Sequence, residues 1–105
     1  MVKKVRKALL KSLAYSLLMR ERINTTEAKA KELKGFAEKL ITHAKAGGLA
    51  QRRLIAGLLP SHAVKKIFDD IGPRFKERSG GYTRIIRIGR SKSDGAKLAI
   101  IELVK

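Results

Sequence analysis

Apolar residues recur at a helical spacing in the first half of the chain. Over residues 3–19 they follow an i, i+3, i+4 pattern with lysines on another side, which predicts an amphipathic helix. Residues 22–25 are short and β-tolerant, so they fit either a strand or a connector. A longer helix is predicted from residue 27 to Gly47-Gly48, because one continuous apolar stripe runs along it through Leu33, Phe36, Ala37, Leu40, Ile41 and Ala44.

Two shorter helices are predicted in the middle of the chain. Residues 49–59 and 61–71 both carry helical patterns, and Pro60 separates them. Ser61 is the expected cap of the later helix, and Gly72-Pro73 is expected to end it.

The pattern changes to alternation near the C-terminus. Residues 82–88 alternate and are rich in β-branched side chains, residues 89–96 are typical of a loop, and residues 97–104 form a second apolar run. Two strands joined by such a loop predict an antiparallel pair. The order helix, strand, three helices, two strands predicts a single α+β domain over residues 1–105, in which a short basic segment (1–7) leads into the first helix. Its two layers are helices packed on a small mixed sheet.

The composition excludes several classes of protein. The chain has 105 residues with 25 Lys plus Arg against 9 Asp plus Glu, and its formal net charge is +16 at pH 7. It has no cysteine, which excludes disulfides, thiolate metal sites and cysteine nucleophiles. The longest uncharged run, residues 54–64, contains Pro60 and is far shorter than the roughly 20 apolar residues of a membrane span. So basic a domain is expected to bind a polyanion, and nucleic acid is the leading candidate.

Residues 72–92 are the most informative part of the chain for that contact. Arginine forks bind phosphate oxygens in pairs, and Gly80 and Gly81 allow a backbone to approach a phosphate closely. Tyr82 is a candidate for stacking on an unpaired base. Glu77 is the only acidic residue in this stretch, against the basic residues Arg74, Lys76, Arg78, Arg84, Arg87, Arg90 and Lys92.

Two further clusters are candidates for the same contact. One lies at the start of the first helix, where a signal peptide and a membrane-surface helix are rival interpretations. The apolar patch there is short and Arg20-Glu21-Arg22 closes it, so a helix packed within the domain is preferred. For both clusters an ordinary solvated helix surface is the alternative. The clusters consist of Lys3, Lys4, Arg6, Lys7 and Lys11, and of Arg52 and Arg53.

Motifs for catalysis or cofactor binding are weak. His43 and His62 lie too far apart for a helical metal pair, and neither has a carboxylate at ligand spacing. Ser61 is explained as a helix cap, and Asp69-Asp70 are expected to face solvent, although a metal-dependent RNA-processing enzyme is the alternative. We predict no enzymatic activity, no cofactor, no metal and no small-molecule substrate. A free architectural nucleic-acid-binding protein is the main alternative to a non-catalytic RNA-binding scaffold.

The C-terminal third carries the motifs of a known family. They are Gly72-Pro73-Arg74-Phe75, Gly80-Gly81-Tyr82-Thr83-Arg84-Ile85 and Ile101-Glu102-Leu103-Val104. Matching residues continue upstream through Ala8-Leu9-Leu10, Ala28-Lys29-Ala30-Lys31-Glu32-Leu33 and Arg52-Arg53-Leu54. On these residues, nearly the whole chain closely resembles the bacterial large-subunit ribosomal protein seventeen family.

The resemblance implies a two-layer fold with the element order given above. It also implies a structural component of the bacterial large ribosomal subunit, in the cytoplasm. Such a protein binds large-subunit rRNA near the outer side of the polypeptide exit tunnel, beside neighbouring large-subunit proteins, and supports subunit assembly. The resemblance supports Arg74, Arg78 and Arg84 as rRNA contacts, with Gly80 and Gly81 allowing a close turn. Basic positions of the family also match Arg6, Lys7, Arg52 and Arg53.

Three features depart from the family pattern. The family usually opens with a longer basic arm, for which only Met1 to Lys4 stand here. In the loop after the first C-terminal strand, Ser91 replaces a family arginine and Ser93 a family glycine. Arg90 and Lys92 flank the lost charge and can restore it with shifted geometry. Lys97 stands where many members have proline, which leaves the start of the last strand less constrained.

Overall fold

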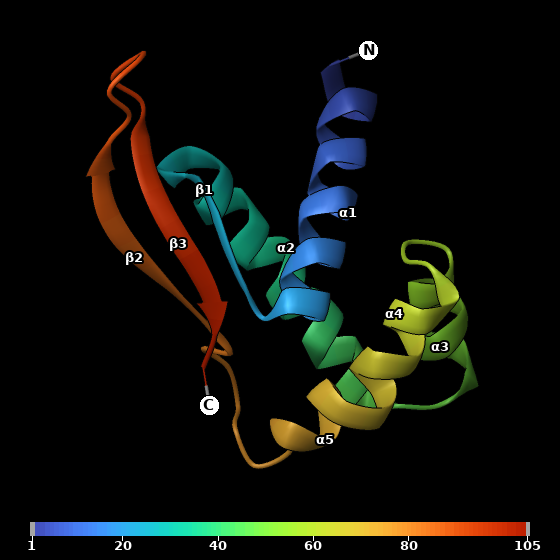
Figure 1. Ribbon diagram of the computed structural model, residues 1–105. Helices are drawn as coiled ribbons and strands as arrows, with labels where there is room; N and C mark the ends of the chain where they lie inside the picture. The colour runs from blue at the N-terminus through green and yellow to red at the C-terminus, as the bar shows by residue number, and fades with distance from the viewer. Residues whose placement is uncertain (1, 105) are drawn as a thin grey trace.

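The first half of the chain forms two long helices with a strand between them. The computed structural model describes residues 2–104, with side chains described from Arg6 onward. Helix α1 (Val2–Arg20) leads into strand β1 (Arg22–Thr26), and helix α2 (Glu27–Ala46) follows directly. The predicted amphipathic helices are confirmed, and the short β-tolerant stretch is a strand (Figure 1).

Strand β1 is joined to the helices on either side by tight junctions without long loops. The Thr26 side chain caps α2, because its hydroxyl oxygen accepts the backbone N–H of Lys29 at 3.3 Å. At the other end of the strand, Glu21 has a φ of 68°, the left-handed conformation that usually belongs to glycine after a helix. The Glu21 N–H donates to the carbonyl of Leu17, and the Glu21 carbonyl accepts from Leu103 of the sheet. The turn at Glu21 therefore joins the end of α1 to the sheet.

The middle of the chain is helical but differs from the prediction in two places. Helices α3 (Leu49–Ala56) and α4 (Ser61–Lys66) form as expected, but Pro60, not Ser61, occupies the cap position. The prediction that Gly72-Pro73 ends the last helix is also wrong. A π-helical turn (Ile67–Ile71) continues α4 into a short helix α5 (Gly72–Arg74). Pro73 lies in the first turn of α5, where a missing backbone N–H loses little.

The sheet contains β1, β2 (Thr83–Arg90) and β3 (Lys97–Leu103) in the order β1-β3-β2. The predicted antiparallel pair is confirmed, and its loop joins β2 to β3. The expectation of a mixed sheet is wrong, since β1 also pairs antiparallel with β3. Strands β1 and β2 run in the same direction, but β3 separates them, so no parallel pair forms.

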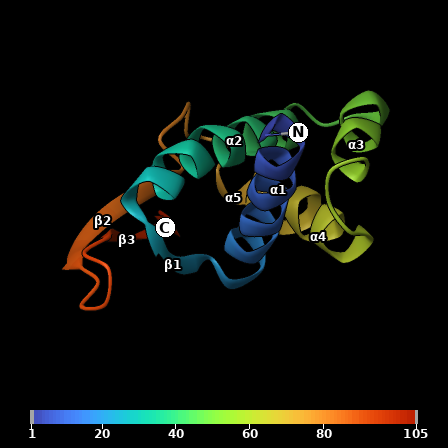
Figure 2. The same ribbon diagram turned by 90° about the horizontal axis from the view of Figure 1, so that it is seen from above.

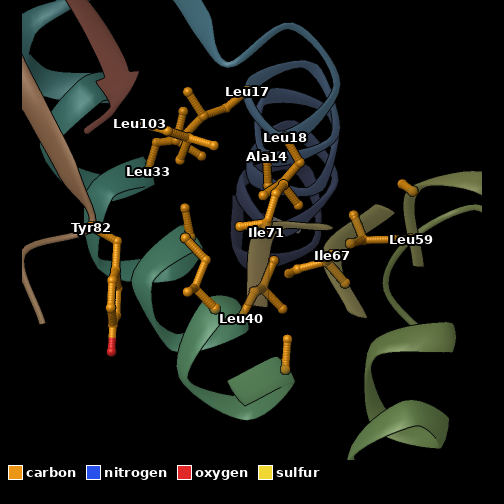
Figure 3. Packing of buried hydrophobic residues seen from close by; sticks show 14 of the residues in the cluster. Ala14, Leu17, Leu18, Leu33, Leu40, Leu59, Ile67, Ile71, Tyr82 and Leu103 are labelled. Atoms are coloured by element: carbon orange, nitrogen blue, oxygen red, sulfur yellow. The ribbon is translucent and has the colours of Figure 1, made fainter. Parts of the chain in front are cut away.

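The predicted α+β domain with helices on a sheet is confirmed. Helices α1 and α2 cover one face of the sheet, while α3, α4 and α5 pack around the far end of α1 and α2 (Figure 2). Within residues 2–104, no helix covers the other face of the sheet (Figures 1 and 2). The core fills the space between the layers, as Figure 3 shows, with Leu17 and Leu18 from α1, Leu33 and Leu40 from α2, Ile67 and Ile71 from the π turn, and Leu103 from β3.

One glycine permits a close contact between helical segments. Gly72 is buried at the start of α5, against the last part of α2. A Cβ atom at this position would lie 3.0 Å from the carbonyl oxygen of Ile67 and 3.5 Å from the backbone of Ala44. Both neighbours are backbone atoms, so they cannot rotate away. The close packing of α5 on α2 therefore depends on glycine at this position.

Candidate nucleic-acid interface

The predicted cations separate into two groups according to their carboxylate partners. Arg6, Arg74, Arg84 and Arg87 each form an ion pair with a glutamate. In the part of the chain whose side chains are described, the others form no ion pair, and they are Lys7, Lys11, Arg52, Arg53, Lys76, Arg78, Arg90 and Lys92. The side chains of Lys3 and Lys4 lie outside the described residues. The cations without an acidic partner lie on α1, on α3, on the segment after α5, and at the end of β2 with the loop that follows it.

In the cluster on α1, Arg6 has a carboxylate partner, whereas Lys7 and Lys11 have none among the described side chains. Arg6 faces Glu32 of α2, with 3.6 Å between its Nε and the carboxylate. Lys7 and Lys11, one helical turn apart, border a hollow whose floor is formed by Leu10 and other apolar side chains of α2 and the α3–α4 connection. The prediction that the apolar side of α1 packs within the domain is confirmed by the burial of Ala14, Leu17 and Leu18.

Arg74 has a structural role that the sequence pattern did not indicate. Its guanidinium donates to both carboxylate oxygens of Glu21, with 2.9 Å from Nη2 to Oε2, and also to Asp70 at 2.9 Å. Lys66 approaches the same Glu21 carboxylate at 3.2 Å and donates to the carbonyl of Met19. These contacts tie α5 and α4 to the end of α1, so the Arg74 guanidinium is already engaged within the domain.

The ion pairs at Glu21 change its acidity. Hydrogen bonds from Arg74, with the help of Lys66 and against the opposing effect of partial burial, lower the pKa of the Glu21 carboxyl from 4.5 to about 2. The same hydrogen bonds raise the pKa of Arg74. The carboxylate is therefore fully charged at neutral pH, at a residue whose backbone is in the left-handed conformation.

The glycine pair after α5 forms a turn around an arginine. Arg78 Nε donates to the carbonyl oxygens of Gly80 and Gly81, both at 3.1 Å. The φ angles of these glycines are 146° and 61°, in the region that other residues rarely adopt. The Lys45 ammonium donates to the carbonyl of Arg78 and holds the same turn against α2. Arg78 as a whole is exposed, and these two hydrogen bonds use its Nε.

The prediction that Tyr82 stacks on a base is wrong, because its ring belongs to the core. Tyr82 is 3% exposed, and its ring centroid lies 5.3 Å from that of Phe75. Its hydroxyl accepts a hydrogen bond from Lys45 at 2.8 Å, which lowers the pKa of the Tyr82 hydroxyl. The next residue, Thr83, is also buried and donates to the Glu38 carboxylate at 2.8 Å.

On the sheet, two arginines of β2 lie on opposite faces. Arg84, Glu102 and Arg22 form one row across the three strands of the open face, with 2.9 Å between Arg84 and the Glu102 carboxylate. Arg22 reaches the same carboxylate at 3.7 Å. Arg87 lies on the helix-covered side and pairs with Glu27 of α2 at 3.5 Å. Arg84 and Arg87 of β2 therefore each have a carboxylate partner, whereas Arg90 at the end of the strand forms no ion pair with the described side chains.

The β2–β3 loop is held by its own polar groups. Arg90 donates to the carbonyl of Gly95 at 3.0 Å, and the hydroxyls of Ser91 and Ser93 lie 3.0 Å apart. The backbone N–H of Ala96 donates to Asp94, which lowers the pKa of that carboxyl. The two serines that depart from the family pattern thus order the loop, and Lys92 projects from it among exposed residues.

Next to the Arg84–Glu102–Arg22 row, the open face of the sheet is apolar. The register places Ile86, Leu98 and Ile100 on this face, and Ile88 lies beside them at a bulge where the register shifts. We call these four residues the open-face patch. Ile86 is 37% exposed and Ile88, at a bulge in β2, is 45% exposed, which is unusual for large apolar side chains. The adjoining row has one glutamate between two arginines, so its positive charge is partly neutralised.

The histidines and aspartates considered for catalysis are separated in space. His43 contacts Gln51 at 2.6 Å, and His62 contacts the hydroxyl of Tyr15 at 2.6 Å. Asp69 is exposed, and Asp70 pairs with Arg74. Among residues with described side chains, no three His, Asp or Glu lie close enough together to hold a metal ion. In the described chain, no helix has the length and apolar character needed to cross a membrane.

Three residues that organise these surfaces were not anticipated. Glu21 and Lys45 join segments more than thirty residues apart in sequence, and no local pattern identifies such partners. Phe68 packs partly on the core, and the Arg52 guanidinium lies over its ring, with 5.0 Å from Cζ to the centroid. The spacing of Arg52 and Phe68 gives no local signal for this contact.

Comparison with known proteins identifies the chain. The sequence profile described as ribosomal protein L17 matches residues 9–104. The chain belongs to the ribosomal protein L17 family. Among curated proteins named large ribosomal subunit protein bL17, it is 55% identical over 100 residues to that of Caldanaerobacter subterraneus subsp. tengcongensis, covering 94% of this chain and 89% of the relative. It is also 53% identical over 100 residues to that of Endomicrobium trichonymphae, covering 94% of this chain and 86% of the relative.

Membership of the L17 family confirms the predicted class of function. The chain is a structural component of the large ribosomal subunit and is not an enzyme. Its place is the ribosome, as a part of a ribonucleoprotein that serves translation. The predicted order of elements and the predicted family thus agree with the structure and with the comparisons.

Proposed function

We propose that the chain binds large-subunit rRNA directly, mainly through the cations that have no carboxylate partner within the domain. The observation that carries this proposal is that eight of the predicted cations form no ion pair with the described side chains. These cations lie on several separate surfaces of the domain. Each removes counterions from the phosphate backbone when it binds. Binding is therefore distributed, and RNA shape rather than base sequence supplies most of its specificity.

We also propose that the domain lies near the outer side of the polypeptide exit tunnel, where it supports subunit assembly beside other large-subunit proteins. The resemblance of its motifs to the L17 family supports the location. The open-face patch supports a protein neighbour, because apolar side chains beside a partly neutralised charged row suit a protein surface better than a phosphate backbone. The neighbour is expected to place an apolar segment over Ile86 and Ile88.

A competition experiment tests the RNA proposal. Purified protein is bound to folded large-subunit rRNA at several salt concentrations, with duplex DNA as competitor. We expect a steep loss of affinity as salt rises, and we expect DNA to compete poorly. Equal competition by duplex DNA would instead favour a free architectural nucleic-acid-binding protein.

A variant series tests which cations act. Lys76→Gln and Arg53→Gln should each reduce the salt slope by about one. Arg78→Ala and Arg84→Ala should also weaken binding if the predicted role of residues 72–92 is correct. An unchanged affinity and salt slope in both arginine variants would remove Arg78 and Arg84 from the interface.

A further inference from the structure

We propose that a notch beside α5 holds a single unstacked nucleotide of RNA, with its base over Arg52 and its phosphate near Lys76. The proposal deepens the rRNA binding proposed above and rests on it. The notch lies where the end of α2, helix α3, the π turn and the segment after α5 meet. It is lined by Lys45, Arg52, Phe68, Asp69, Gly72 and Lys76.

The notch provides a platform for a base. The Arg52 guanidinium lies over the Phe68 ring, with 5.0 Å between Cζ and the ring centroid. Phe68 is partly buried and packs on the core, so it holds the guanidinium from the inner side. In RNA complexes, unpaired bases commonly stack on the planar guanidinium groups of arginines. A base added on the outer side of Arg52 completes a stack that starts in the core.

The charges at the notch suit a phosphate. Three cations line it against the single carboxylate of Asp69. Lys45 is fixed by its hydrogen bonds to the Arg78 carbonyl and the Tyr82 hydroxyl. Arg52 and Lys76 form no ion pair within the described side chains and remain available to an anion. A phosphate attached to the stacked base therefore has Lys76 as its partner.

Glycine backbone forms one edge of the notch at the end of α2. Gly47 lines the notch with a φ of 70°, and a Cβ atom at this position would have nothing within 4 Å. Gly72 also lines the notch, but its Cβ position is directed at the backbone of Ile67 and Ala44. The notch is therefore open beside Gly47. A protein segment is the less suitable occupant, because the rim carries charged rather than apolar side chains.

Binding of the full-length chain to short RNAs tests the proposal. The probes are single-stranded hexa-adenosine RNA, a blunt RNA hairpin of equal charge and inorganic phosphate, followed by backbone amide NMR shifts. We expect the single strand to shift Gly47, Gly72 and Lys76 more than either other probe does. Arg52→Lys keeps the charge but removes the planar guanidinium, so we expect it to weaken single-strand binding about tenfold. Lys65→Gln, on exposed α4 surface, is the charge control, with an expected change below twofold.

The outcomes separate this inference from the proposed function. If Arg52→Lys binds the single strand like the wild type, or if phosphate alone gives the same shifts, the nucleotide site is wrong while rRNA binding stands. If the wild type fails to bind large-subunit rRNA, the proposed function itself is wrong. Phe68→Leu provides a second test of the stack, and thermal unfolding shows whether it folds. If Phe68→Leu unfolds, single-strand binding by the Arg52→Lys variant, whose changed residue is exposed, still tests the nucleotide site.

Discussion

Arg74 and Glu21, which are 53 positions apart in the sequence, form a paired hydrogen bond with 2.9 Å from Nη2 to Oε2. The contact joins the end of α1 to α5, and Asp70 and Lys66 complete the network. An arginine that the family motif points to as an RNA contact is therefore a structural clamp in the free domain. Residues that stabilise the fold and residues that bind RNA can therefore be distinguished by mutation.

Replacing Arg74 should mainly reduce stability. The Arg74 side chain is 27% exposed and that of Glu21 36%, so solvent weakens their attraction, and Arg74→Ala should cost about 1 kcal/mol of unfolding free energy. Lys76→Ala, two positions away and exposed, should change stability by less than about 0.5 kcal/mol but weaken rRNA binding. Urea unfolding and filter binding of both variants check this. Equal losses of stability would contradict the clamp.

The Glu21 carboxylate should make the domain sensitive to acid. Its pKa is lowered from 4.5 to about 2 on folding, so the stabilisation is complete above pH 4.5 and is lost as the pH falls toward 2. Glu21→Gln has no charge to lose, so its urea midpoint should be lower at neutral pH and should approach that of the wild type in acid. Parallel curves for the two proteins from pH 7 to pH 2.5 would contradict the assignment.

Two glycines should respond in opposite ways to alanine. Gly72→Ala places a Cβ 3.0 Å from the Ile67 carbonyl oxygen, so it should destabilise the domain by about 1–3 kcal/mol. Gly35 lies inside α2 with nothing within 4 Å of a Cβ, so Gly35→Ala should stabilise by about 0.5–1 kcal/mol. Thermal unfolding measures both. A neutral Gly72→Ala would show that α5 does not pack closely on α2.

The open-face patch should act in assembly rather than in RNA binding. The double variant Ile86→Thr with Ile88→Thr keeps β-branched side chains, so the strand and the affinity for isolated rRNA should be preserved. Its lysine crosslinks from Lys92 and Lys97 to neighbouring proteins in purified large subunits should decrease. Leu54→Gln, which changes another exposed apolar residue, is the control. Unchanged crosslinks in the double variant would remove the patch from the protein interface.

Local patterns predicted the secondary structure well where the spacing of apolar residues within one element determines which of its faces is buried. The stripe on α2 is an example, because Leu33, Leu40 and Ile41 are all buried as expected. The β2–β3 pair could be predicted as well, since residues 82–88 alternate as a strand with one covered face does, and a loop joins them to the apolar run 97–104. The extension through Gly72-Pro73 could not, because it depends on how closely α5 approaches α2.

The cation clusters could be located from the sequence, but which of the cations have a carboxylate partner in the fold could not. The local sequence does not distinguish Arg52 and Lys76 from Arg74 and Arg87. In the structure, only Arg74 and Arg87 of these four pair with carboxylates from distant segments. Tyr82 failed for a related reason, because it sits in a polar, glycine-rich stretch but its ring packs on Phe75. Such pairings depend on tertiary contacts and leave no mark in local spacing.

Ultraviolet crosslinking of salt-washed large subunits that contain this protein tests the central claim most directly. Mass spectrometry identifies the peptides that carry nucleotides, and sequencing identifies the crosslinked rRNA positions. Direct rRNA binding predicts nucleotide adducts on peptides that contain Lys7, Arg52, Lys76 or Lys92, with rRNA positions near the outer side of the exit tunnel. A protein that washes off in salt, or that stays bound but carries no nucleotide on any of these peptides, would contradict it.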